Sequence, residues 1–148
     1  MTAIPMRCTR AMDYRAGSEP DPHPPAPLDL VPILGTWWNT NHRTMGITKV
    51  ELVVRGRTPW MRVWAADPLD GPHEWGEAPV TAVYADGPFS SVVAGYTATF
   101  ELGHARTAIQ ANLNLGLTIL AAFTTFLDGS GRANYLSREF YSQVGEWP

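Results

Sequence analysis

The chain has 148 residues, a length typical of one domain, and a formal net charge of −3 with 17% charged residues. It contains no basic tract, so a nucleic-acid binder that follows the phosphate backbone is excluded. Its single cysteine, Cys8, excludes a disulfide scaffold and a cysteine-bound zinc site. No apolar run reaches the roughly 18 residues of a membrane span, and no signal-peptide core follows Met1. We therefore expect a cytoplasmic protein that does not bind membranes.

Residues 1–28 differ in composition from the remainder of the chain. Six of the thirteen prolines lie in this segment. Because proline lacks an amide donor and fixes φ, the segment is predicted to be an extended, flexible arm rather than a helix or a central strand. The folded domain is expected over residues 29–148.

Within this domain, apolar and polar side chains alternate with a period of two, which is typical of half-buried strands, and Gly, Pro and Asp mark turns at short intervals. The predicted strands are residues 34–41, 46–55, 58–66, 75–85, 90–101, 106–113, 117–126 and 133–142. One helical turn is expected near residues 29–33. Eight short sequential strands favour an all-β, antiparallel up-and-down barrel, because closure removes exposed edges. A sandwich is the main alternative.

The run Gly35-Thr36-Trp37-Trp38-Asn39 resembles the first strand of the calycins, the lipocalin and avidin group of β-barrels. The resemblance implies that Trp37 lies across the closed end of the barrel and that Asn39 reaches a ligand from inside. It also invites comparison of Arg132 and Arg138 with the lipocalin arginine that contacts this tryptophan, a structural role.

A second resemblance covers more of the chain. Residues 46–50, 63–64, 74–77 and 126–132, followed by Tyr135, are similar to a group of uncharacterised bacterial small β domains. That group often carries two cysteines in the loop before its Trp-Gly pair, whereas residues 65–73 of this chain contain none. The resemblance supports the fold and implies no activity.

No motif for nucleophilic, metal or phosphate chemistry is present. The sequence lacks a Gly-x-Ser-x-Gly elbow, metal-ligand spacing and glycine-rich phosphate loops. The four histidines fall in the arm or in predicted turns and are expected to be exposed. We therefore expect neither a metal nor a cofactor.

The functional candidates are the aromatic and polar side chains that the barrel lumen would gather. Asn39, Arg62 and Tyr96 are candidate catalytic residues. Candidate ligand-binding residues are Trp37, Asn41, Trp60, Trp64, Tyr84, Phe100, Gln110, Phe123, Tyr135 and Tyr141, with Phe126 as a further aromatic. The alternative for most of them is a purely structural place in the core. Arg62 would form a solvated surface ladder if its strand face points outward, and would need an anionic partner if it points inward.

Three functions remain open. The first is a small cofactor-independent cyclase or isomerase that folds a hydrophobic substrate in the lumen and excludes water. Lys49 is the only lysine among eleven basic residues, a bias that indicates a GC-rich bacterial genome, and a genome rich in natural-product metabolism would favour the cyclase. The others are a carrier or sensor of an apolar small molecule, and an interaction module with a filled lumen. Pairing of two copies through outer strand faces is also left open.

Overall fold

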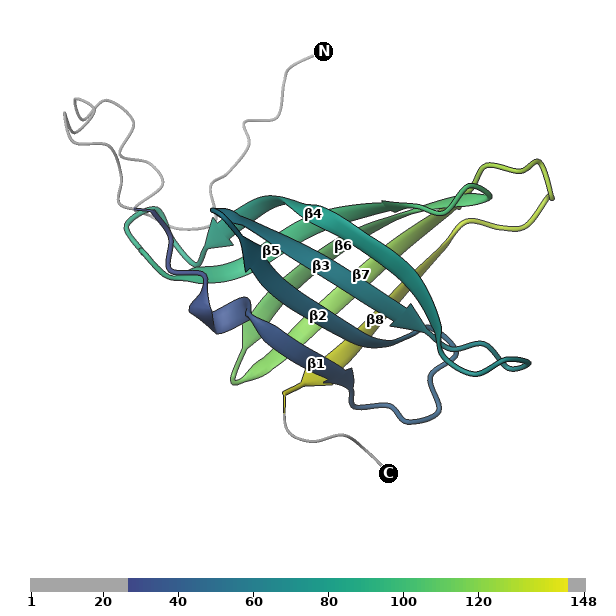
Figure 1. The fold of residues 1–148 in the computed structure, drawn as a ribbon, viewed down its shortest axis with the longest axis horizontal. Coiled ribbons are helices and arrows are strands. Elements are labelled where there is room, and N and C mark those ends of the chain that lie inside the picture. Colours follow the sequence, from purple (N-terminus) through teal and green to yellow (C-terminus); the bar gives the residue numbers. More distant parts are fainter. Residues whose placement is uncertain (1–26, 144–148) are drawn as a thin grey trace, which may run out of the picture.

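The computed structural model describes residues 27–143, which form one closed antiparallel β-barrel (Figure 1). The strands are β1 (Gly35–Asn39), β2 (Ile47–Arg55), β3 (Thr58–Ala65), β4 (His73–Ala85), β5 (Val93–Glu101), β6 (Ala105–Asn114), β7 (Leu117–Phe126) and β8 (Tyr135–Ser142). Each strand pairs with the next, and β8 pairs with β1. The predicted all-β up-and-down barrel is confirmed, and the sandwich alternative is excluded.

The barrel closes through a short seam between β1 and β8. Two residue pairs form it, Trp38 with Ser142 and Asn39 with Tyr141, and the backbone amide of Thr40 donates to the carbonyl of Phe140 at 2.8 Å. By contrast, β6 and β7 pair over ten residues. The seam is therefore the part of the wall with the fewest backbone hydrogen bonds, and it depends on side chains for reinforcement.

The two ends of the barrel differ. Because neighbouring strands are antiparallel, the loops after β1, β3, β5 and β7 gather at one end, which we call the mouth (Figure 1). The shorter β2–β3 and β6–β7 turns lie at the other end, beside the 3₁₀-helix η2 (Val31–Ile33). The predicted helical turn near residues 29–33 is thus confirmed as a helix that covers the closed end.

The Gly-x-Trp signature closes this end. Ile33 of η2 is fully buried, Trp37 is 3% exposed, and the Trp37 indole Nε1 donates to the Ile33 carbonyl at 3.0 Å. Gly35 has φ of 103°, and a Cβ there would lie 3.1 Å from Gln143 Nε2, which donates to the Leu34 carbonyl. Glycine is favoured at this position because L side chains rarely adopt such a φ.

The comparison with the lipocalin arginine is wrong for this chain. Arg138 lies on the outer wall near the ring of Phe140, 5.9 Å from its centroid. Arg132 lies over the ring of Phe126 at 4.0 Å, next to the mouth. The polar contact of Trp37 is instead made by the helix backbone.

The lower lumen is filled by inward-facing side chains. Those less than 2% exposed include Leu52, Met61, Val63, Tyr96, Ile109, Leu120 and Tyr141. Because they come from β2, β3, β5, β6, β7 and β8, they converge on the barrel axis from most of its circumference. This apolar core fixes which face of each strand points inward.

The outer wall has two chemically different halves. On β2–β4 the outward charges are paired, as in Arg55 with Glu77 at 2.6 Å and Arg62 with Glu74 at 2.7 Å. On β5–β8 most of the outward side chains away from the mouth are uncharged, and Arg138 is the exception. The uncharged ones include Ala94, Thr97, Thr99, Ala108, Gln110, Asn112, Ile119, Ala121, Phe123, Leu136 and Phe140. One side of the barrel therefore carries most of its charge.

Most of the predicted arm, residues 1–26, lies outside the described residues. The chain enters the barrel through Asp29, whose backbone pairs with residues 91–93 between β4 and β5. Over the described part of the chain, no helix has the length and apolar character needed to cross a membrane.

Replacing Trp37 by Ala is expected to destabilise the fold by about 3–5 kcal/mol, because a large buried ring and its hydrogen bond are lost at the closed end. Urea unfolding followed by circular dichroism measures this. Trp38→Ala is the matched control: Trp38 faces outward and contacts Lys49 at 4.9 Å, so a loss of about 1 kcal/mol is expected. Equal losses in both variants would contradict the assignment of Trp37 to the closed end.

Candidate functional site

A cavity of about 400 Å³ opens at the mouth of the barrel. It is lined by His73, Glu74, Trp75, Glu101, Leu102, His104, Ala105, Thr107, Thr124, Phe126 and Tyr135. These residues come from the mouth ends of β4, β5, β6, β7 and β8 and from the β5–β6 turn, which the topology brings to one end of the barrel. We call this cavity the mouth pocket.

Aromatic rings form two sides of the mouth pocket. Trp75 on β4 packs edge-to-face on Phe100, with ring centroids 5.9 Å apart and planes at 61°. Phe126 at the end of β7 lies 6.1 Å from Tyr135 at the start of β8. Arg132 covers Phe126 and is itself held by Asp128 at 2.6 Å. The pocket therefore offers apolar ring surface from β4 and from the β7–β8 hairpin.

Two threonines supply hydroxyls between these aromatic sides. Thr107 and Thr124 are buried on β6 and β7, and their Oγ1 atoms are 3.0 Å apart. Since a hydroxyl has one donor and two acceptor positions, this bond leaves acceptor capacity on both oxygens. A ligand that reaches between the two rings thus meets Thr124, which is 7% exposed, while the fully buried Thr107 holds the Thr124 hydroxyl in place.

The rim of the mouth pocket carries ionisable residues. Glu74 is paired with Arg62 at 2.7 Å, and Glu101 with Arg106 at 2.6 Å. His104 is exposed, with its Nδ1 atom 3.1 Å from the carbonyl of Leu102. Because the carboxylates are already paired with arginines, the imidazoles of the rim are the groups best placed to exchange protons or hydrogen bonds with a ligand.

Strand β8 shows how far the opening extends. Its inward side chains become less exposed away from the mouth: Tyr135 is 53% exposed, Ser137 and Glu139 are half-buried, and Tyr141 is 1% exposed. Beyond Tyr141 the side chains of the apolar core fill the barrel. The lumen is therefore open at the mouth and packed toward the closed end.

A polar network ties the β1–β2 loop to β8. The Asn39 amide Nδ2 lies 2.8 Å from Glu139 Oε2, 2.9 Å from the Ile47 carbonyl and 3.3 Å from Tyr141 Oη. Thr44 Oγ1 donates to Glu139 at 2.8 Å, and Asn39 Oδ1 accepts from the backbone amide of residue 41 at 2.8 Å. The amide of Asn39 is thus fully used by protein groups, and it reinforces the short seam.

The two buried tyrosines of this region have different surroundings. Tyr141 Oη donates to the carbonyl of Ile47 at 2.8 Å, whereas Tyr96 Oη has no hydrogen-bond partner among the described residues. Burial raises the pKa of Tyr96, and burial together with the charge of Glu139 raises the pKa of Tyr141. Both phenols stay neutral at ordinary pH.

Six of the residues predicted for the lumen do point into the barrel. Tyr135 lines the mouth pocket and Phe100 supports Trp75 beneath it, while Tyr96 is 1% exposed in the core. The others, Trp37, Asn39 and Tyr141, lie deeper or at the seam. Asn41 was predicted on the same face, but it lies beyond β1 in the exposed loop, where its amide reaches Glu139 at 3.3 Å.

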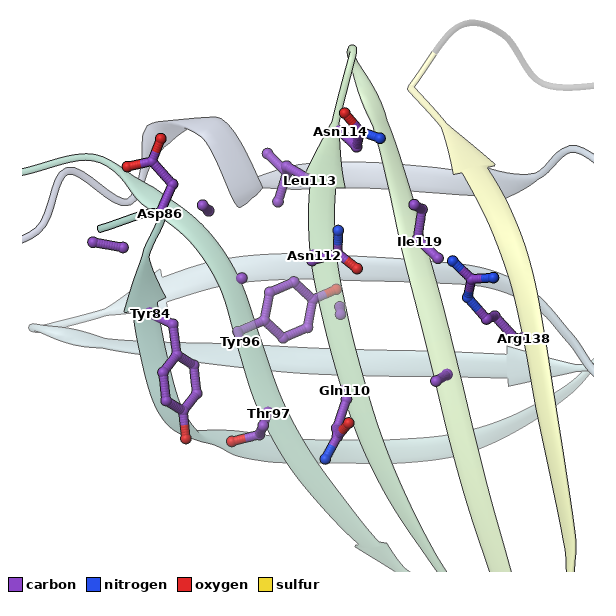
Figure 2. Close-up of a pocket in the computed structure, with 15 residues that line it drawn as sticks. Tyr84, Asp86, Tyr96, Thr97, Gln110, Asn112, Leu113, Asn114, Ile119 and Arg138 are labelled. Atoms are coloured by element: carbon purple, nitrogen blue, oxygen red, sulfur yellow. The ribbon is translucent and has the colours of Figure 1, made fainter. Parts of the chain in front are cut away.

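Six other residues lie outside the lumen in which they were expected. Trp60, Arg62 and Trp64 face outward on β3, because Met61 and Val63 between them fill the core. Tyr84 on β4, Gln110 on β6 and Phe123 on β7 likewise face outward and are exposed. Tyr84 and Gln110 line a groove of the outer wall (Figure 2). Arg62 takes the surface alternative, with Glu74 at 2.7 Å, Glu51 at 3.7 Å and the Trp64 ring at 5.0 Å.

Several mouth residues were missed as site candidates, among them Trp75, Thr107 and Thr124. The rim histidines His73 and His104 were expected to be exposed, which they are. The convergence of these mouth residues on one cavity could have been found from the topology. In an up-and-down barrel the loops after odd-numbered strands share one end, so the residues that flank the loops 66–72, 102–104 and 127–134 must lie close together.

No family model matches the chain, and no curated protein or solved structure matches it either. The closed eight-stranded barrel with a buried Gly-x-Trp tryptophan is consistent with a calycin-like fold. In the described part of the chain, no three His, Cys, Asp or Glu side chains are grouped so as to hold a metal ion.

Replacing Asn39 by Ala is expected to destabilise the fold by about 1–3 kcal/mol, because the partly buried Glu139 and the Ile47 carbonyl lose their donor. Urea unfolding measures the loss. Asn41→Ala is the matched control and should cost less than about 0.5 kcal/mol, since Asn41 is exposed. An unchanged stability with loss of ligand binding would instead restore the predicted site role of Asn39.

Removal of the two buried phenol hydroxyls is expected to have opposite consequences. Tyr96→Phe should leave the free energy of unfolding unchanged or raise it by about 1 kcal/mol, because a buried hydroxyl without a partner is removed. Tyr141→Phe should lower it by about 1–2 kcal/mol through loss of the bond to Ile47. A loss in Tyr96→Phe at least as large as in Tyr141→Phe would contradict this assignment.

Proposed function

We propose that the protein binds a small molecule with an apolar or aromatic body in the mouth pocket. The supporting observation is the contrast along the barrel axis: the lumen is packed at the closed end and holds a cavity of about 400 Å³ at the mouth. This volume lies within the roughly 300–1,000 Å³ of small-molecule sites, which combine apolar walls with a few polar groups.

The pocket chemistry suggests how such a ligand lies. Its apolar body fits between Trp75 on one side and Phe126 with Tyr135 on the other, where ring contacts are favourable. A polar end points to the rim, where His73 and His104 are within reach of solvent. The resulting preference is for amphipathic molecules, since a fully apolar ligand would leave the rim groups without contacts.

A cyclase or isomerase is the second candidate, and one observation favours it. His73, His104 and the Tyr135 hydroxyl line the same pocket, and histidine is the side chain best suited to donate and accept protons near neutral pH. The reaction would then rest on these three groups, because Arg62 is outside the lumen and Asn39 and Tyr96 lie away from the pocket lining.

Binding in the mouth is tested with anilinonaphthalene sulfonate (ANS), an amphipathic dye whose fluorescence rises in apolar sites. Tyr135→Ala is expected to weaken ANS binding by about tenfold or more, which corresponds to about 1.4 kcal/mol of lost ring contact. Leu136→Ala is the matched control: it is the next residue, 59% exposed against 53% for Tyr135, and faces outward. Equal weakening in both variants, or no saturable ANS binding, would contradict the proposal.

Proton-transfer chemistry is tested separately with whatever small molecule co-purifies with the protein in native mass spectrometry. Incubation with the protein in deuterium oxide should place deuterium on carbon atoms of that molecule if the rim histidines move protons on it, and deuterium on oxygen or nitrogen is removed by back-exchange into ordinary water before the mass is measured. The double variant His73→Ala and His104→Ala should bind the molecule without exchange. Absence of exchange with the unaltered protein would reject the enzyme and leave the binding protein.

A further inference from the structure

A second and larger hollow, of about 760 Å³, lies on the outer wall over β4–β8, away from the mouth pocket. Figure 2 shows it as a groove with Tyr84 on one side and Arg138 on the other, and with Thr97, Gln110 and Asn112 between them. We call it the outer groove. Most of its walls come from β5–β8, the half of the barrel that carries few charges, and β4 adds Tyr84 and Ala85, followed by Asp86.

Strand register explains why the wall is hollowed here. Tyr84 on β4, Gly95 on β5 and Asn112 on β6 are consecutive partners across three strands. Gly95 has no side chain, and a Cβ there would lie 2.6 Å from the Ala111 carbonyl, so no larger residue fits without a shift. Tyr84 and Asn112 therefore stand about 10 Å apart, two strand spacings, on either side of bare backbone.

The neighbouring register repeats this pattern. Gln110 on β6, Ala121 on β7 and Arg138 on β8 are consecutive partners. The small side chain of Ala121 leaves a second slot, again about 10 Å wide between backbones, with an amide on one side and a guanidinium on the other. Each slot has room for one ring or one planar group between its two taller side chains.

The side-chain amides and the guanidinium of the outer groove are not used by the fold, whereas Thr97 is bonded to Thr81 Oγ1 at 2.9 Å and Asp86 also has a partner. Gln110, Asn112 and Asn114 are exposed, stand at every second position of β6, and make no side-chain hydrogen bond within residues 27–143. Arg138 forms no ion pair there, and its ring contact with Phe140 is long, at 5.9 Å. On the opposite half, by contrast, Arg62 and its neighbours are paired.

These groups select one class of ligand. Each carboxamide both donates and accepts, as a sugar hydroxyl does, so a row of them suits a hydroxyl-rich ring better than an apolar one. The exposed ring of Tyr84 offers a flat surface for stacking. Arg138, the one cation among the described lining residues, suits one carboxylate in its own slot, four strands from Asp86 at the end of β4, and is too little for a nucleic-acid backbone. A peptide cannot add as a strand here, because the described barrel has no open edge.

We infer that the outer groove is a binding site for an acidic sugar or a short acidic oligosaccharide, distinct from the mouth pocket. The sugar ring lies over Gly95 against Tyr84 and donates to Asn112 and Gln110. Its carboxylate, or that of the adjoining unit, takes the slot over Ala121 and pairs with the Arg138 guanidinium.

The test uses trigalacturonate as the acidic probe and maltotriose as the neutral one, each titrated to millimolar concentration into ¹⁵N-labelled protein. Trigalacturonate is expected to shift the backbone amide signals of residues 95–97, 110–112 and 119–121 and of Arg138, and to leave those of the mouth pocket unchanged. The double variant Gln110→Ala and Asn112→Ala should weaken trigalacturonate at least tenfold. Both side chains are exposed, so the melting temperature of this variant should stay as it is.

Arg138→Gln should remove the preference for trigalacturonate over maltotriose. Arg57→Gln is the matched control: Arg57 is also exposed and has no ion pair within residues 27–143, but lies in the β2–β3 turn, and its replacement should leave that preference intact. The inference is overturned if neither sugar shifts the groove signals, if the shifts lie at the mouth, or if the double variant binds as well as the unaltered chain. It is also overturned if light scattering finds a dimer that these substitutions dissociate, since a second copy would then occupy the groove.

Discussion

Closure of the sheet at the β1–β8 seam is the constraint on which the rest of the molecule depends. Only two residue pairs join these strands, so the backbone alone holds the seam weakly. The Asn39 amide adds bonds to Glu139 and to the Ile47 carbonyl, and thereby connects β8, β1 and the start of β2 from inside. Without closure there would be no lumen, no separate mouth and two exposed edges.

The closed barrel then divides its length between stability and binding. Ile33 and Trp37 fill the end that η2 covers, and the apolar core continues upward to Tyr141 and Tyr96. Above that level the side chains no longer meet across the axis, and the mouth pocket remains. A domain of this size thus devotes most of its interior to the core and keeps a cavity at one end, where the β3–β4, β5–β6 and β7–β8 hairpins supply the polar rim.

Much of the fold was predictable because its signals are local. Alternation places β3 within one residue of its observed ends, and Gly35-Thr36-Trp37 marks the closed end. The inward face of each strand was harder to predict, because a period of two assigns Trp60 and Met61 to opposite faces but does not say which of them lies inside. Mouth residues such as His73 and Thr124 were missed because they are far apart in the sequence and meet only when the sheet closes, so that the strand order, and no local pattern, brings them together.

Lys49, the only lysine of the chain, lies between two indoles on the charged half of the wall, 3.9 Å from the Trp64 ring centroid and 4.9 Å from that of Trp38. Its strand, β2, is four strands from β6 in either direction around the barrel. The single ε-amine is therefore a natural handle for chemical attachment: coupling to a support through Lys49 would present the amide row of β6 to solution on the far side. The same acylation would remove the ammonium charge and both ring contacts.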